Sequence, residues 1–318
     1  MEKVRLFHAV DVHGSEIVWR KWLSIPKVHK ADILLFCGDL TGKLIIPIIE
    51  EKKDHYKTQV YGRWVEASGK AGLEKLVEKI TGSGFYTHVC APDEYDRLMK
   101  NPEEVNKLFR EYMRERIERW LDMVNEKLPK EIKVVVMPGN DDSFEIDEII
   151  KAHEDRVIYP LEKVVNLCFD YQMLSFDWVN PTPWDTPREA SEEELWKKLE
   201  KLKDKFSGEW DKVIVNFHCP PYGTKLDLAP KLDKNLKPVV FLGRIIFEHV
   251  GSKSIYRFIH ENQPMLGLHG HIHEAYASDR VGKTLVVNPG SEYSECILRG
   301  FIVDLDKKGV DKWWKIEG

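Results

Sequence analysis

The sequence is poor in cysteine and has no long apolar run. Its five cysteines are widely spaced and never form a Cys-x-x-Cys pair, so they indicate neither a disulfide framework nor a cysteine zinc site. The longest apolar runs, at 33–37 and 134–137, fall far short of the roughly 18 residues that a membrane-spanning helix needs. The N-terminus reaches His8 and Asp11 with no apolar targeting segment before them. We therefore expect a cytoplasmic protein with free thiols and no membrane partner.

Neither sign of charge dominates the chain. Its 318 residues carry 48 Lys and Arg against 53 Asp and Glu, a net charge of -5. This balance removes the general attraction to phosphate backbones, so we expect no general nucleic-acid binding. Glutamine is rare beside abundant Lys and Glu, a bias typical of hyperthermophile proteins that predicts a thermophilic source. The composition, 42% hydrophobic, and the length predict one globular domain over 1–318 with room for a large insertion.

Short apolar segments precede turn residues at 4–10, 33–37, 134–137 and 213–217, and each predicts a buried strand. Helical patterns lie between them, at 144–153 and 189–206, which makes the chain α/β. For the second helix, Thr186 is the expected N-cap, Pro187 the first helical residue and Glu189 the partner in a capping box. Strand-rich sequence at 157–179 and from 280 onward, with turn cues at 281–283 and 307–309, predicts a second sheet.

Residues 43–130 separate two motif-bearing turns and are predicted to be a helical insertion. Asn101 as N-cap, followed by Pro102 and Glu104, begins a long helix that runs toward Pro129. The simplest interpretation is a charged surface helix that covers a core. The alternative is that the glycine-flanked loop at 82–88 forms a lid over a site.

Metal-competent side chains follow five of the predicted strands. The motifs are Asp11-Val-His13, Gly38-Asp39, Gly139-Asn140-Asp141-Asp142, His218 and Gly270-His271-Ile-His273. Ligands in α/β proteins bind beyond the carboxyl ends of the strands, so these distant turns can meet at one edge. A mixed set of imidazole and carboxylate ligands suits transition metals rather than calcium.

In this order, the motifs resemble the pattern D-x-H, G-D, G-N-H-[DE], H and G-H-x-H of the calcineurin-like metallophosphoesterase superfamily. The resemblance spans Asp11 to His273, and the stretches 216–224 and 288–291 are similar to predicted phosphoesterases of this superfamily in archaea and bacteria. It implies a four-layer α/β/β/α sandwich that hydrolyses small-molecule phosphate esters. The insertion is not explained by the motifs.

The resemblance also implies two divalent transition-metal ions, Mn²⁺, Fe²⁺, Zn²⁺, Ni²⁺ or Co²⁺. One ion would be held by Asp11, His13, Asp39 and His273, and the other by Asp39, Asn140, His218 and His271. Asp39 would bridge the two ions. Such a pair clamps a phosphate and lowers the pKa of a bridging water, so that a bridging hydroxide attacks and no protein nucleophile is needed.

Asn140, Asp141 and Asp142 are the candidate catalytic residues. Asp141 stands where the superfamily commonly has the His that protonates the leaving group, and an Asp near its ordinary pKa is a poor general acid. This departure favours phosphodiesters, or esters with acidic leaving groups, over alkyl phosphomonoesters. Asp142 matches the acidic position that orients the missing His, so its role is open.

Two further histidines lie near these motifs. His269 alternates with His271 and His273 and could share their face, but Gly270 directly before His271 favours the 271/273 pair. A supporting or core role is then expected for His269. His8 lies inside the first strand, and we expect it to be a hydrogen-bonded core histidine.

Two alternatives to a phosphodiesterase stay open. One is a phosphomonoesterase or protein phosphatase of the same superfamily. The other is a non-catalytic scaffold, since the retromer subunit with this fold is an interaction surface. All the proposed ligands are present here, which favours an enzyme.

Overall fold

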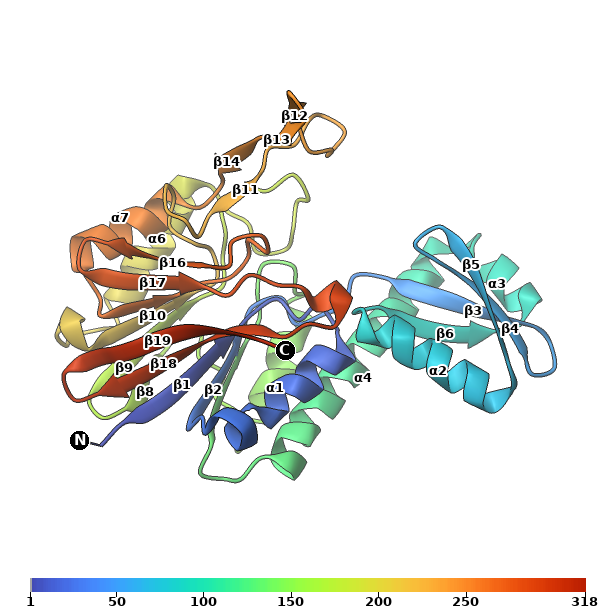
Figure 1. Cartoon of the computed structure of the whole chain (residues 1–318), viewed down its shortest axis with the longest axis horizontal. Helices are drawn as coiled ribbons and strands as arrows, with labels where there is room; N and C mark the ends of the chain where they lie inside the picture. The colour runs from blue at the N-terminus through green and yellow to red at the C-terminus, as the bar shows by residue number, and fades with distance from the viewer. Residues whose placement is uncertain (1) are drawn as a thin grey trace.

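Two β-sheets face each other at the centre of the molecule (Figure 1). In the computed structural model, which describes residues 2–318, the first sheet has the order β19-β18-β1-β2-β7. Its strands are β1 (Val4–Ala9), β2 (Ile33–Cys37), β7 (Lys133–Met137), β18 (Arg299–Asp306) and β19 (Gly309–Glu317). β1, β2 and β7 run parallel, and β18 runs antiparallel to β1. The carboxyl ends of the three parallel strands therefore lie at one edge.

The second sheet has the order β16-β17-β15-β10-β9-β8. Its strands are β8 (Val164–Cys168), β9 (Tyr171–Phe176), β10 (Val213–Phe217), β15 (Leu266–Leu268), β16 (Ala277–Val281) and β17 (Thr284–Asn288). The predicted second sheet is thus confirmed, with one correction. The strands after residue 280 divide between the two sheets, because the almost wholly buried β18 pairs with β1 and carries β19 with it.

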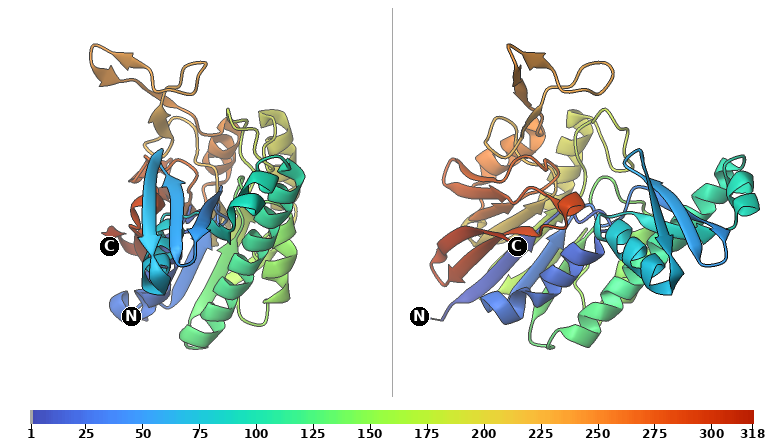
Figure 2. Two further views of the ribbon diagram at one scale, coloured as in Figure 1. Left: turned by 90° about the vertical axis from the view of Figure 1, so that its right-hand side faces the viewer. Right: turned by 45° about the vertical axis from the view of Figure 1, so that its right-hand side comes forward.

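Helices cover the outer face of each sheet, which gives the expected four-layer α/β/β/α arrangement (Figures 1 and 2). α1 (Glu16–His29), α4 (Pro102–Lys127) and α5 (Glu145–Ala152) pack against the first sheet, and α6 (Glu192–Lys203) and α7 (Lys253–Asn262) against the second. The alternation along β10 shows this layering. Ile214 joins the core shared with the first sheet, whereas Val213 and Val215 join the core under α6 and α7.

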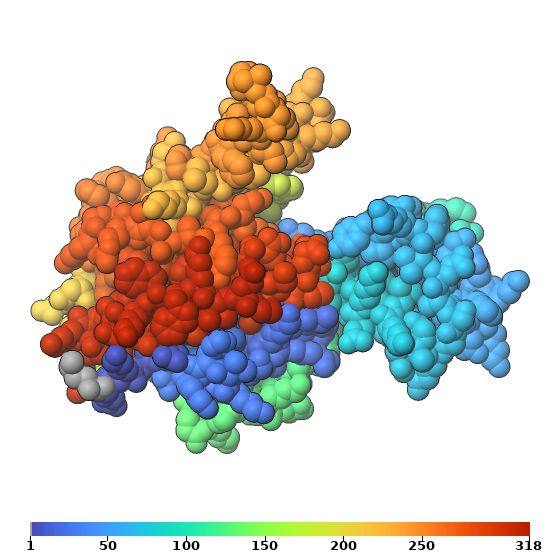
Figure 3. All heavy atoms as spheres, viewed as in Figure 1, coloured from blue at the N-terminus to red at the C-terminus, as the bar shows by residue number. Residues whose placement is uncertain are grey.

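The insertion contains the expected helices and also a four-stranded sheet that the sequence analysis missed. Its strand order is β5-β4-β3-β6. Its elements are β3 (Ile45–Lys52), β4 (His55–Val60), β5 (Arg63–Ser68), α2 (Gly69–Gly82), β6 (Tyr86–Cys90) and α3 (Pro92–Leu98). A small core of Ile48, Tyr56, Leu76 and Ile80 holds it together, and it stands at one side of the sandwich (Figure 3). The strands expose polar faces, so they lack the continuous apolar runs that mark the central strands.

We call the four-stranded sheet of the insertion, with α2 and α3, the lobe. α4 joins the lobe to the sandwich. Its predicted N-cap is confirmed, because the Asn101 side chain accepts a hydrogen bond from the backbone N–H of Glu104. The first half contacts the lobe, where the ring of Phe109 lies 5.4 Å from that of Tyr86. The second half lies under the first sheet, and its Trp120 stacks on Trp19 of α1 at 4.6 Å.

The predicted start of α6 is wrong by a few residues. The helix begins at Glu192, with Ser191 as N-cap and Glu194 completing the capping box. Thr186 and Glu189 do interact, but in the preceding loop, where the Thr186 hydroxyl and N–H both donate to the Glu189 carboxylate. The backbone there pairs with Val179, and this pairing replaces the helical turn.

A second projection spans residues 228–249, which we call the arm. It contains β11 (Leu228–Pro230), β12 (Val240–Phe241), β13 (Arg244–Ile245) and β14 (Phe247–His249). The arm rises from the sandwich as a narrow ribbon (Figure 2). Among residues 2–318, no helix has both the length and the apolar character needed to cross a bilayer.

An ion cluster around the buried Glu16 ties α4 to α1. Arg116 Nε lies 2.9 Å from Glu16 Oε1, and Arg119 pairs with both oxygens of Glu16. Arg116 also donates to the carbonyl of Gly14, in the turn that follows His13. Burial opposes ionisation of Glu16, but Arg119 and Arg116 outweigh it and hold the pKa of Glu16 below its ordinary value.

Replacing Glu16 by Gln should lower the free energy of unfolding by about 2 kcal/mol at neutral pH, because a buried arginine loses its counter-charge. A depressed carboxyl pKa stabilises the fold above the ordinary pKa, and this stability is lost as the pH falls through the lowered pKa. The difference between parent and variant should therefore shrink in acid. Denaturant unfolding at about pH 7 and about pH 3 measures it. The exposed Glu118→Gln on α4 is the control, and an equal difference at both pH values would contradict the ion-pair explanation.

Candidate metal centre

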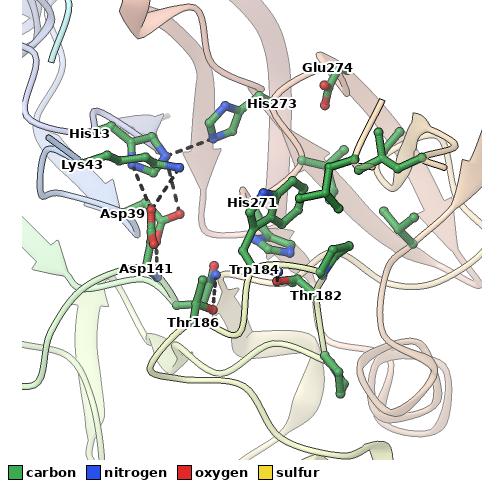
Figure 4. Close-up of a pocket in the computed structure, with 18 of the residues that line it drawn as sticks. His13, Asp39, Lys43, Asp141, Thr182, Trp184, Thr186, His271, His273 and Glu274 are labelled. Atoms are coloured by element: carbon green, nitrogen blue, oxygen red, sulfur yellow. Dashed lines mark hydrogen bonds and ion pairs between the residues drawn. The ribbon is translucent and has the colours of Figure 1, made fainter. Parts of the chain in front are cut away.

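The motif residues meet at the carboxyl edge of the two sheets, as predicted. Asp11 and His13 follow β1, Asp39 follows β2, and Asn140 and Asp141 follow β7. The second sheet contributes His218 after β10, and His271 and His273 after β15. His13, Asp39, Asp141 and His273 point toward a common space (Figure 4).

Four of the motif residues at this edge have a strained backbone. Asp11, His13, Asp39 and His271 all have positive φ angles, of 55°, 39°, 49° and 68°. Left-handed conformations are uncommon for residues with a Cβ, and they persist where the surrounding structure imposes them, often at functional sites. The strain aims these four side chains into one space.

One group of possible ligands comprises Asp11, His13 and His273, whose ligand atoms lie within 4.8 Å of one another. The Nε2 atoms of His13 and His273 are 3.1 Å apart. Asp11 is anchored by the backbone N–H of His271, which donates to its Oδ2 at 3.0 Å. Within residues 2–318, the buried Oδ1 of Asp11 has no hydrogen-bond partner, an arrangement that suits a bound cation.

A second group comprises Asp39, His218 and His271. His218 Nε2 lies 3.5 Å from Asp39 Oδ1 and 3.0 Å from Asn140 Oδ1. The other ring nitrogen, Nδ1, lies 3.4 Å from the Cys37 carbonyl. Donation to that carbonyl would leave Nε2 free to act as a ligand.

The loop before α6 orients Asn140. The Thr186 hydroxyl donates to Glu189, so its oxygen can accept the hydrogen bond that Asn140 Nδ2 donates at 2.8 Å. This contact fixes which end of the amide is the oxygen. The side-chain oxygen of Asn140, Oδ1, consequently faces His218 and the proposed metal space. Thr186 and Glu189, expected to cap a helix, support the site instead.

A third group comprises His13, Asp39 and Asp141. Asp39 therefore belongs to two groups, and its oxygens face opposite ways. Oδ2 lies 3.6 Å from His13 Nε2, and Oδ1 lies 3.5 Å from His218 Nε2. The Asp141 backbone N–H also donates to Asp39 Oδ1 at 3.0 Å.

The buried carboxylates of the site have too few positive charges beside them to balance their own negative charge. Burial and the nearby Asp39 raise the pKa of Asp11 to about 8, although His218 opposes the rise. Burial alone would lower the pKa of His218, but Asp39 and Asp11 outweigh it and raise that pKa to about 9. This buried space therefore favours protonation of both Asp11 and His218. A divalent cation bound there would supply the positive charge that these protons otherwise provide.

The remaining imidazoles are neutral at physiological pH, the form that binds metals. Burial is the main cause, and it lowers the pKa of His271 to about 3 and that of His273 to about 4. For His13, burial and the charge of Lys43 lower the pKa well below its ordinary value. The donor set thus fits borderline transition metals.

Asp142 is buried behind the site. Its Oδ2 accepts from the N–H groups of Leu40 and Gly139, and its Oδ1 accepts from the N–H and hydroxyl of Thr41. It therefore holds the Asp39 loop against the loop after β7. These contacts suit a positioning role for Asp142, which the sequence analysis placed among the candidate catalytic residues with its role open.

His269 and His8 form part of the core behind the ligands. His269 Nδ1 donates to the Phe217 carbonyl at 2.8 Å, and His269 is in none of the three ligand groups found among residues 2–318. His8 Nε2 lies 2.9 Å from the His269 carbonyl. Both residues are fully buried, as expected for core or supporting histidines.

Lys43 is the functional candidate that the sequence analysis missed. Its Nζ lies 3.0 Å from Asp141 Oδ2, and its half-exposed side chain faces the cavity beside Asp39. Burial would lower the pKa of Lys43, but Asp141 and Asp39 raise it above its ordinary value. A Lys four residues after a ligand is common in any sequence, so no pattern singled it out. Tyr293 was also missed, and its ring lies 4.8 Å from that of His13.

The ligand groups open into a cavity of about 1230 Å³. α4, the loop before α6 and the base of the arm form its walls. The loop at 82–88 does not line it. The interpretation of that loop as a lid therefore gains no support: Tyr86 is a buried strand residue whose hydroxyl accepts from the Gly42 N–H.

Comparison with known proteins supports the fold. No family model matches the chain. Two solved structures align over 99% of this chain and 99% of their own. One has 15% identity and a TM-score of 0.55, and the other, the protein TT1561 of Thermus thermophilus, has 13% identity and a TM-score of 0.53. At these identities the likeness concerns the fold alone.

An uncharacterized protein of Methanocaldococcus jannaschii is similar in sequence, with 32% identity over 161 residues. The match covers 50% of this chain and 64% of that protein, so the chain spans less than two thirds of the relative's length. A dimetal phosphatase from Danio rerio aligns more distantly, with 9% identity and a TM-score of 0.42 over 99% of this chain and 98% of that one. That likeness is too weak to support a conclusion.

Proposed function

We propose that the chain is a dinuclear metal-dependent phosphoesterase that hydrolyses small-molecule phosphate esters, with phosphodiesters favoured. The observation that carries this proposal is the placement of Asp39. One of its oxygens faces His13 and the other faces His218, as a carboxylate between two ions requires. A structural carboxylate in a core would instead be paired with hydrogen-bond donors on both oxygens.

The proposed ligands are those of the first two groups, with Asn140 added because its Oδ1 lies 3.0 Å from His218 Nε2. Asp11, His13 and His273 would hold one ion, His218, His271 and Asn140 would hold the other, and Asp39 would bridge them. Two bound divalent cations would neutralise phosphate charge and lower the pKa of a coordinated water.

The chain's own residues would orient and balance this centre. Thr186 keeps the Asn140 oxygen directed inward, and Asp142 fixes the loop that carries Asp39. Lys43 presents a cation to the cavity next to Asp39, where it could contact a phosphoryl oxygen. These residues bind and position, and none of them needs to act as a nucleophile.

The preference for diesters rests on the missing histidine at position 141 and on the Lys43 ammonium, whose Nζ lies 3.0 Å from Asp141 Oδ2 and opposes protonation of that carboxylate. Burial and Asp39 raise the pKa of Asp141, while Lys43 opposes the rise. A carboxylate that pairs with an ammonium group is stabilised in its charged form. We therefore expect weak protonation of the leaving oxygen and the best turnover for leaving groups that depart unaided.

The metal requirement is the first test. Protein loaded with Mn²⁺, Zn²⁺, Co²⁺, Fe²⁺ or Ni²⁺ should retain two ions per chain, and chelation should abolish hydrolysis of a bis-aryl phosphate. Elemental analysis and anomalous scattering measure the stoichiometry and location of the ions. Retention of a single ion at saturation would overturn the dinuclear assignment.

Substrate comparison separates the alternatives. Faster turnover of bis-aryl than of mono-aryl phosphates would support a diesterase, and the reverse order would support a phosphomonoesterase or protein phosphatase. Two bound ions with no hydrolysis of either ester would support a scaffold.

A further inference from the structure

The outer part of the arm exposes an unusual amount of apolar surface. We call residues 234–247 the arm tip. Leu242 is 87% exposed and Phe241 64%, and Leu236, Val240, Ile245 and Phe247 are also exposed. Clusters of this kind on a soluble chain commonly mark an interaction surface. The hairpin of β12 and β13 at the end of the tip stands clear of the sandwich (Figure 3), whereas Lys234, Leu236 and Pro238 line the cavity.

The turn at the end of the tip has an unfavourable first residue. Leu242 and Gly243 connect β12 to β13 with φ angles of 48° and 76°. Two positive φ angles in a two-residue hairpin favour Asn-Gly or Asp-Gly. A leucine here costs backbone energy and places an apolar side chain at the most exposed point. The tip is otherwise ordered by backbone hydrogen bonds, such as Ile246 N–H to the Val239 carbonyl at 2.9 Å.

The apolar side chains lie on both faces of the hairpin. Val240 pairs with Ile245 across the strands, and Phe241 pairs with Arg244. Successive residues of a strand point to opposite faces, so Val240 and Phe241 project in opposite directions. A globular partner covers one face of a hairpin, whereas a lipid interface surrounds an inserted tip.

The charge of the tip favours a partner with negative charge. Residues 234–247 carry Lys234, Lys237 and Arg244, and Asp233 and Glu248 flank them, so positive charge exceeds negative charge there although the whole chain has a net charge of -5. A symmetric contact between two copies through this tip would bring like charges together, which is unfavourable. Cations around an apolar end match an anionic bilayer surface, where each Lys or Arg adds to binding.

We propose that the arm tip docks on an anionic lipid surface by inserting Phe241 and Leu242 between headgroups. Docking of this kind needs no spanning helix, so it replaces the sequence-based expectation of no membrane partner. The arm lines the cavity through Pro230 and Leu232 at its base and through Leu236 and Pro238 of the tip, and docking would bring the cavity toward the lipid surface. The proposal does not depend on the chemistry of the metal centre.

Sedimentation of the full chain with vesicles tests the proposal. Vesicles of equal parts phosphatidylcholine and phosphatidylglycerol should bind the protein, and vesicles of phosphatidylcholine alone should bind it much more weakly. Phe241→Ser with Leu242→Ser should weaken binding at least about tenfold. Lys237→Gln with Arg244→Gln should weaken it about twenty-fivefold, since each cation near an anionic surface contributes about fivefold.

Matched controls come from exposed sites elsewhere. Met99→Ser removes a comparably exposed apolar side chain, at 66%, and Lys70→Gln with Lys107→Gln removes two exposed cations of the insertion and α4. These variants should bind like the parent. Circular dichroism should show that the tip variants, which lie outside the core, keep the parent fold.

Three results would overturn the proposal. The first is no binding of the parent to anionic vesicles, and the second is equal loss in the control and tip variants. The third is a difference in molar mass, measured by light scattering, between the parent and the variant with Phe241→Ser and Leu242→Ser. The proposal expects the two masses to be equal. A parent dimer that this variant dissociates would assign the tip to a second copy of the chain.

Discussion

Replacing Asp39 by Ala should reduce hydrolysis by at least about a thousandfold and lower the metal content below two ions per chain, if the proposed centre is correct. Both ions would lose the carboxylate between them, and with it several kcal/mol of charge stabilisation. A single substitution at Asp39 affects both sets of proposed metal ligands, because one of its oxygens faces His13 and the other faces His218. His273→Ala, which removes a ligand from one set only, should have a smaller effect.

Asp39→Asn is the matched variant for shape. It can still accept the hydrogen bond that the Asp141 N–H donates to Oδ1, but it lacks the charge. Elemental analysis and steady-state rates should place it close to Asp39→Ala. Two tightly held ions in Asp39→Ala would contradict the bridging role, whatever the activity. Thermal unfolding of each variant distinguishes loss of metal from loss of fold.

The central strands and the placement of the motif residues could be predicted from the sequence because these strands are buried on both faces. The segments at 33–37 and 213–217 match β2 and β10, and the motif residues after them lie where parallel strands place their carboxyl ends. Continuous apolar runs are strong signals. The convergence of Asp11, Asp39 and His218 followed from that order.

The lobe sheet and the arm could not be predicted in the same way. Their strands are exposed on at least one face, and β12 and β13 have only two residues each. Such segments lack the apolar periodicity that distinguishes a strand from a loop. The start of α6 failed for another reason, since Thr186 and Ser191 both precede a Glu at the capping distance. Only the tertiary pairing of Val179 with Glu189 decides between them.

Asp141 was recognised from sequence as a departure from the motif, but its partner was not. The Lys43 side chain reaches Asp141 from the other loop of the site, where Asp39 also lies. Contacts between loops depend on the relative placement of β2 and β7, which no local pattern encodes. The position at which the superfamily pattern has a histidine thus holds Asp141, which forms an ion pair with Lys43 beside the proposed metal centre.

Lys43→Met should lower kcat/KM for a bis-aryl phosphate about a hundredfold, because a fixed cation beside the developing phosphoryl charge is lost. Lys43→Arg keeps the charge and should recover part of the rate. Metal content should stay at two ions per chain in both variants, since Lys43 offers no ligand to either ion. A loss of metal in Lys43→Met would show that the residue supports the centre structurally instead.

Asp141→Asn completes the comparison, because it keeps the size of the side chain and removes the charge that pairs with Lys43. If Asp141 only positions Lys43, the rate for aryl diesters should change modestly, and its dependence on the leaving-group pKa should match that of the parent. A proton donor behaves differently, since its loss harms poor leaving groups most. A markedly steeper dependence in Asp141→Asn would therefore assign proton donation to Asp141, and the raised pKa that burial and Asp39 give this carboxyl would then be the physical basis of that role.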